Sequence, residues 1–160
     1  MPDYRRNRVP GGTYFFTVNL LERGSCLLVE HIDAFREAVR QLRARRPFHI
    51  DAWVMLPDHT HCIWTLPPGD TDYSARWKAI KIAFAKSLPK TERLSAVRGR
   101  KGERGIWQRR FWEHTIRDER DYAAHVARAY QSVQAWTRAM GKRMALLVIS
   151  SLRDCGDLSE

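Results

Sequence analysis

The sequence predicts an α+β fold in which helices cover an antiparallel sheet. Short segments rich in β-branched and aromatic residues alternate with longer segments whose apolar residues recur every three or four positions. Their order along the chain is β-α-β-β-α-β-α, which suits an antiparallel sheet covered by helices. With 160 residues, the chain is expected to form one domain, long enough to bury a core.

The first half of the chain is expected to contain three strands and one helix. Residues 13–20 follow a Pro-Gly-Gly turn and are mostly β-branched or aromatic, which predicts the first strand. Residues 32–45 carry apolar side chains at helical spacing, which predicts an amphipathic helix that ends near Pro47. Residues 48–56 and 59–66 are apolar segments joined by a Pro-Asp pair, and they fit an antiparallel strand pair.

The second half is expected to contain two helices and one strand. Residues 73–88 place Trp, Ile and Phe at helical spacing among lysines and arginines, which predicts a basic helix. Residues 89–105 are polar, basic and interrupted by glycine, so we expect an exposed loop. Residues 106–116 alternate again and predict a strand, and residues 118–138 contain no Gly or Pro and predict a final helix.

The charge of the chain indicates a polyanionic partner. Lys and Arg number 28 against 18 Asp and Glu, for a net charge of +10, which favours neutralising phosphates and releasing their counterions. Nucleic acid is the leading expected partner, and free use of arginine on a solvated surface is the alternative.

The compartment is expected to be the cytoplasm. The N-terminal residues lack the apolar core of a secretory signal, and no apolar run is long enough to cross a bilayer, so we expect no membrane partner. The three cysteines, Cys26, Cys62 and Cys155, have no paired spacing and are interpreted as reduced thiols.

A His-x-His pair is the clearest candidate metal site. His59 and His61 lie two apart in a predicted strand, so their side chains should share one sheet face and could hold one cation. Open positions on that cation would accept a phosphate oxygen, which points to phosphoryl-transfer chemistry. The alternative is two hydrogen-bonded surface histidines. Asp58 is either a turn residue or a partner of one imidazole nitrogen.

Two basic segments are candidate DNA-binding elements. The predicted helix over residues 73–88 carries Arg76, Lys78 and Lys81, and Arg109 and Arg110 lie among aromatic residues in the segment that follows the loop. Arginine interleaved with aromatics can bind phosphates and stack exposed bases, so single-stranded or hairpin DNA would suit it. The alternative is that the aromatics are core residues.

Three segments together resemble the tyrosine transposases associated with repetitive extragenic palindromes (REP). They are residues 11–20 (GGTYFFTVNL), 53–64 (WVMLPDHTHCIW) and 106–114 (IWQRRFWEH), within a similarity that spans most of residues 4–126. The resemblance implies a ferredoxin-like fold, REP hairpin DNA as partner, and Mg²⁺ or Mn²⁺ as cofactor. It also implies cleavage of single-stranded DNA through a 5′-phosphotyrosine link. His59 and His61 fall on the family's two histidine ligands, and Thr60 stands where the family is typically apolar.

The last predicted helix departs from that family. The position of the nucleophilic tyrosine holds Arg128, and the Asn-Pro that supplies the third metal ligand is replaced by Ser132 and Val133. Tyr130 and Gln134 are the substitutes that the chain offers, four residues apart and on one helix face.

Three functional hypotheses stay open on the sequence. One is an active transposase with a slipped helix that uses Tyr130 as nucleophile and Gln134 as ligand. The second is a DNA-binding protein without cleavage activity that retains the histidine pair and the basic surface. The third is a basic module that binds RNA hairpins. A monomer or a homodimer fits each of them.

The departure at the C-terminus indicates a shift of reading frame near Val126. Read one base later, codons for residues 131–137 permit Asn-Pro-Phe-Lys-His-Gly, and codons for residues 144–150 permit Trp-Pro-Tyr-Ser-Ser-Phe, both similar to motifs of the family. We therefore divide the chain into residues 1–126, transposase-like, and residues 127–160, a final helix and tail outside the ancestral frame. Residues outside that frame were not selected to pack, so residues 145–149 are expected to dock poorly, the region around Gly141 to fray and the tail from Ser151 to be loose.

Overall fold

The computed structural model describes residues 5–140 and has one four-stranded antiparallel sheet. The strands are β1 (Thr13–Asn19), β2 (His49–Met55), β3 (His59–Thr65) and β4 (Trp112–Thr115), in the spatial order β2-β3-β1-β4. β1 is central and pairs with both β3 and β4. This order, with helices in both crossover connections, is the ferredoxin-like arrangement that the family resemblance implied.

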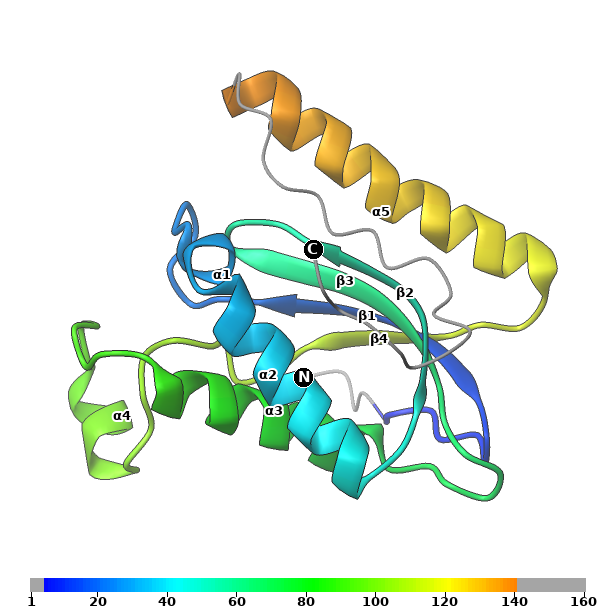
Figure 1. Cartoon of the computed structure of the whole chain (residues 1–160), viewed down its shortest axis with the longest axis horizontal. Coiled ribbons are helices and arrows are strands. Elements are labelled where there is room, and N and C mark those ends of the chain that lie inside the picture. The colour runs from blue at the N-terminus through cyan, green and yellow to red at the C-terminus, as the bar shows by residue number, and fades with distance from the viewer. Residues whose placement is uncertain (1–4, 141–160) are drawn as a thin grey trace.

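Helices cover both faces of the sheet (Figure 1). α2 (Ile32–Arg45) and α3 (Tyr73–Ser87) lie side by side on one face, and α5 (Glu119–Met140) crosses the other. The expected order of seven elements is confirmed. Two short helices were not expected, α1 (Leu27–Glu30) and α4 (Ala96–Arg100), because a single turn is too short to show a period.

Local chemistry sets the ends of α3. The Asp72 carboxylate accepts a hydrogen bond from the backbone N–H of Ala75 at 3.0 Å, which caps the first turn. Leu88 adopts an extended conformation directly before Pro89, as the proline ring requires, so the helix ends there.

The strand expected over residues 106–116 is wrong in its first half. β4 begins only at Trp112, and the earlier part makes a single bridge between Leu20 and Trp107. Ile106 and Trp107 are buried in the core under α2 and α3, so burial rather than strand pairing accounts for their apolar character. The expected loop over residues 89–105 is also wrong in part, because it contains α4.

The described part of the chain has no helix long and apolar enough to cross a membrane. The region around Gly141, the segment 145–149 and the tail from Ser151, which were expected to pack poorly, lie outside the described residues.

Candidate functional site

The two histidines of β3 share the sheet face that α5 covers. Their ring centroids lie 5.0 Å apart, and the His61 ring contacts Phe15, whose centroid is 5.5 Å away. The alternate residues Cys62 and Trp64 are buried on the opposite face, against α2 and α3. The period-two alternation of the strand therefore places both imidazoles together, as the sequence predicted.

Each imidazole is oriented through its Nδ1 atom. Nδ1 of His59 lies 2.6 Å from Oδ1 of Asp58, and Nδ1 of His61 lies 2.9 Å from the Thr17 hydroxyl. Asp58 also accepts a hydrogen bond from the backbone N–H of Gly24 at 3.0 Å, so it orients His59 and also stabilises the turn at Gly24. Such partners leave Nε2 of each ring for a cation.

The donor set fits a divalent cation. Nε2 of His61 is buried and has no hydrogen-bond partner among the described residues, and a buried polar atom of this kind normally has one. Burial, with smaller electrostatic contributions from the neighbouring His59 and Arg128, lowers the pKa of His61 to about 4. The ring is therefore neutral near pH 7, which is the form that binds metal. The alternative of two surface histidines is wrong for His61, which is 7% exposed.

Thr60, where the sequence departs from the family pattern, lies away from this pair. Its hydroxyl is fully buried on the opposite face, where it accepts a hydrogen bond from the Trp53 indole at 2.6 Å and donates to the Val54 carbonyl at 2.8 Å. The hydroxyl is satisfied inside the core, so the departure leaves the histidine pair unaffected.

The structure brings Tyr130, but not Gln134, to a cavity that His61 lines. This small cavity, of about 50 Å³, lies between α5 and the sheet and is lined by Phe15, His61, His125 and Tyr130 among others. Gln134 is exposed and instead lines a surface hollow with Val133 and Thr137. The spacing of four residues did place Tyr130 and Gln134 next to each other, but only Tyr130 reaches the cavity.

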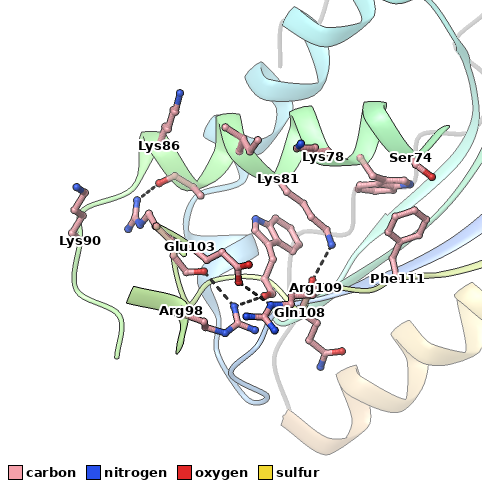
Figure 2. A pocket seen from close by; sticks show the side chains of 16 residues that line it. Ser74, Lys78, Lys81, Lys86, Lys90, Arg98, Glu103, Gln108, Arg109 and Phe111 are labelled. Atoms are coloured by element: carbon pink, nitrogen blue, oxygen red, sulfur yellow. Dashed lines mark hydrogen bonds and ion pairs between the residues drawn. The ribbon is translucent and has the colours of Figure 1, made fainter. Parts of the chain in front are cut away.

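A basic groove runs along α3 on the other side of the molecule (Figure 2). Its volume is about 710 Å³, and its walls are α3 and the segment 98–111. Phe111 is partly exposed at the groove, whereas Trp107, at 7% exposed, is a core residue as the alternative interpretation expected. Exposed cations surround them: Lys78, Lys86, Lys90 and Arg109. Arg109 forms an ion pair with Glu103 at 2.9 Å. The groove combines cations with aromatic rings, which is the pairing that binds single-stranded nucleic acid.

Lys81 crosses this groove. Its ammonium donates a hydrogen bond to the Gln108 carbonyl at 2.9 Å and lies 5.5 Å from the centre of the Phe111 ring (Figure 2). Burial, with a smaller contribution from the charge of Arg6, lowers the pKa of Lys81 to about 8. Its charge is therefore sensitive to pH just above neutrality.

The expectation that Arg76 lies on the DNA-binding surface is wrong. The residue is 1% exposed, and its guanidinium pairs with Asp70 at 2.7 Å and donates to the Pro47 carbonyl at 2.9 Å. Helical spacing placed Arg76 beside Trp77 on the buried side of α3, whereas Lys78 is exposed. Arg110 is exposed but does not line the groove.

Two further arginines were not singled out in the sequence. Arg104 donates to the carbonyls of Ala85, Leu88 and Pro89 at the end of α3, and Arg98 donates to the Trp107 carbonyl at 3.2 Å. Both hold the wall of the groove in place. The basic run over residues 98–104 gave no signal to separate these structural arginines from surface ones.

Comparison with known proteins decides the family. No family model matches the chain. Over 130 residues, 81% of this chain and 71% of the relative, it is 47% identical to the REP-associated tyrosine transposase of Escherichia coli K12. The chain belongs to the REP-associated tyrosine transposases. A Haemophilus influenzae protein assigned provisionally to the same family is 43% identical over 131 residues, 81% of this chain and 74% of that protein.

Solved structures agree with that assignment. A REP-associated tyrosine transposase bound to a REP hairpin superposes with a TM-score of 0.70 at 37% identity, and the match covers all of this chain and 94% of the other. A Deinococcus radiodurans protein described as a candidate transposase has a TM-score of 0.50 at 16% identity, covering 89% of this chain and 99% of that one. The second likeness shows the shared fold alone.

Proposed function

We propose that this REP-associated transposase binds hairpin-bearing single-stranded DNA through the basic groove along α3. The observation that carries the proposal is the gathering of exposed Lys78, Lys86, Lys90 and Arg109 around the rings of Trp107 and Phe111. The REP hairpin bound to a relative of the same fold supports it. Phosphates would be neutralised by the cations, and an unpaired base would stack on the partly exposed ring of Phe111.

The chain offers a matched pair of arginines for the test. Arg109 is half-exposed and paired with Glu103 inside the groove, and Arg40 is similarly exposed and paired with Glu37 on α2, away from it. Arg109→Ala and Arg40→Ala therefore remove the same charge and the same type of ion pair. We expect only Arg109→Ala to weaken hairpin binding, and to reduce the slope of log affinity against log salt by about 1.

Fluorescence anisotropy with labelled DNA hairpins over a range of salt concentrations would measure both effects. If the two variants bind the hairpin equally well, the groove is not part of the DNA interface. An RNA hairpin of matched sequence forms the second arm, because tighter binding to RNA than to DNA would favour an RNA-binding module instead.

The histidine pair is proposed to hold Mg²⁺ or Mn²⁺. Two observations support this. Nε2 of His61 is buried without a hydrogen-bond partner among the described residues, and Asp58 and Thr17 contact Nδ1 of His59 and of His61, respectively. The bound ion would polarise a phosphate oxygen and neutralise charge on a phosphodiester. The protein residues would orient the two rings and, by burying His61, keep it neutral.

Strand cleavage is a separate property, and we propose that this chain lacks it. The resemblance places Arg128 at the position of the nucleophilic tyrosine, and Gln134 does not line the cavity that His61 shares with Tyr130. We expect no covalent protein–DNA adduct when a hairpin substrate is incubated with the protein and Mn²⁺, as measured by denaturing gel electrophoresis. An adduct that disappears in Tyr130→Phe would contradict this and identify Tyr130 as nucleophile.

We propose that α5 departs from the family pattern because the reading frame shifts near Val126. Residues 127–160 would then be translated outside the ancestral frame. α5 continues without interruption through this point to Met140. The nucleotide sequence tests the proposal directly. The next frame should encode the Asn-Pro and Trp-Pro motifs of the family, and a frame without them would overturn the frameshift and leave Tyr130 as the candidate nucleophile.

A further inference from the structure

A second group of candidate ligands lies where β4 meets the first turns of α5. It consists of His114 from the strand and Asp121 and His125 from the helix, which are four residues apart on one helix face. Within residues 5–140 this is the one group of three histidine, cysteine or acidic residues whose ligand atoms all lie within 4.8 Å of one another. No local sequence pattern marks this group, because its members are seven and four residues apart and belong to two elements.

The separations within the group suit a small cation. Nε2 of His114 lies 2.9 Å from Oδ2 of Asp121, and Nδ1 of His125 lies 3.2 Å from Oδ1 of the same carboxylate. In the metal-free structure Nδ1 of His125 also lies 2.8 Å from the backbone carbonyl of Asp121, and an ion would take the place of the proton it donates there. Ligands bound at about 2.0–2.2 Å to a tetrahedral ion lie roughly 3.3–3.6 Å apart. The three ligand atoms all lie within 4.8 Å of one another, and the two rings lie side by side with their centroids 4.3 Å apart.

The surroundings prepare these side chains for metal binding. The Asp121 carboxylate accepts hydrogen bonds from the backbone N–H of Arg117 at 3.0 Å and from its guanidinium at 3.2 Å, which fix it beside the two rings. Asp121 and His125 are nearly covered, and His114 is 27% exposed, which leaves an approach for a water or another fourth ligand.

We propose that His114, Asp121 and His125 form a second divalent-cation site, one that binds Zn²⁺ and is separate from the His59 and His61 pair. Two imidazoles and one carboxylate are ligands that zinc prefers. The Phe15 ring separates the two sites, because it contacts His61 at 5.5 Å and His125 at 4.9 Å. An ion here joins β4 to the start of α5 and so fixes the helix that carries Tyr130.

The alternative is that the three side chains form only a hydrogen-bonded cluster. Zinc titration by calorimetry, on untagged full-length protein first stripped with EDTA, separates the two. In the His59→Asn/His61→Asn background we expect one zinc equivalent to remain. Adding Asp121→Asn, which keeps the size of the side chain, should weaken that affinity at least tenfold. His49→Asn, at an exposed histidine beside Asp51, is the control and should leave binding unchanged.

Two further measurements keep the test decisive if a combined variant folds poorly by circular dichroism. In the otherwise unchanged protein, Asp121→Asn should lower the zinc stoichiometry by one, and the visible absorption of bound Co²⁺ should lose its contribution from this site. Absence of zinc from the His59→Asn/His61→Asn protein overturns the proposal, as does zinc binding that Asp121→Asn leaves intact. Neither outcome depends on DNA, so the proposed hairpin binding stands or fails separately.

Discussion

The two faces of the sheet are built differently. The face under α2 and α3 buries twenty-four side chains in one cluster, including the stacked rings of Trp64 and Trp77, whose centroids are 4.6 Å apart. The face under α5 buries a cluster of six among the described residues; α5 contributes Ala129 and Val133, with Tyr122 and Trp136 partly buried against them. The first face supplies most of the apolar burial that stabilises the fold. The second is thinly packed, and it carries both groups of histidines.

The largest expected effect sharpens that contrast in stability. Trp64→Ala removes a fully buried indole from the α2 and α3 face and should cost about 3–5 kcal/mol of unfolding free energy. Val133→Ala removes two methyl groups from the α5 face and should cost about 1–2 kcal/mol. Urea unfolding monitored by circular dichroism measures both. Similar costs would mean that α5 is as firmly packed as the opposite layer.

Arg76 and Lys78 make a second comparison, between a buried and an exposed cation of α3. Arg76→Ala leaves Asp70 and the Pro47 carbonyl without their partner and should cost about 2–4 kcal/mol, whereas Lys78→Ala should change stability by less than about 0.5 kcal/mol. For hairpin affinity, measured per folded molecule, we expect Lys78→Ala to cause the larger loss and Arg76→Ala the smaller one. If folded Arg76→Ala loses as much affinity as Lys78→Ala, Arg76 does contribute to the DNA interface and the prediction is wrong.

The lowered pKa of Lys81 predicts that hairpin binding at the groove depends on pH. Because its folded pKa is about 8 and its ordinary pKa is 10.5, the folded chain loses this proton first, and the positive charge in the groove falls as pH rises from 7 to 9. Hairpin affinity should drop about two- to tenfold over that range. Lys81→Arg, which stays charged, should remove the drop. Anisotropy at constant ionic strength measures it, and an equal drop in both proteins would assign it to another group.

The same shift affects stability in the opposite direction. Between about pH 8 and 10.5 the unfolded chain binds more protons at this residue than the folded chain does, so the contribution of Lys81 to unfolding free energy increases with pH. Lys81→Met should remove that contribution. Urea midpoints at pH 8 and pH 10 compare the two proteins, and parallel trends would contradict a lowered pKa.

The smallest effect is expected at Tyr130, a half-exposed residue of α5 at the edge of the cavity. Tyr130 is 52% exposed, so Tyr130→Phe should change the unfolding free energy by less than about 0.5 kcal/mol. The same urea titrations measure it. A cost above 1 kcal/mol would indicate that the phenol makes a buried hydrogen bond at the cavity.

Sequence patterns predicted most elements of this fold because their signals are local. The helix expected over residues 32–45 has those bounds in the structure, and the Pro-Asp junction does join two antiparallel strands. The strand predicted to include residues 106–111 is absent there, because the same apolar pattern occurs both in a strand and in a buried loop. The shared face of His59 and His61 followed from the period of two, which needs no tertiary information.

Other features were decided only by the tertiary structure. Charge and spacing along the chain indicated a basic protein with a histidine pair, but they could not separate Arg76, buried against Asp70, from Lys78, which faces solvent. Nor could they bring His114 to Asp121 and His125. The physical reason is the same in both cases. The local pattern determines the direction of a side chain relative to its own element, whereas its neighbours depend on how elements pack across the sheet.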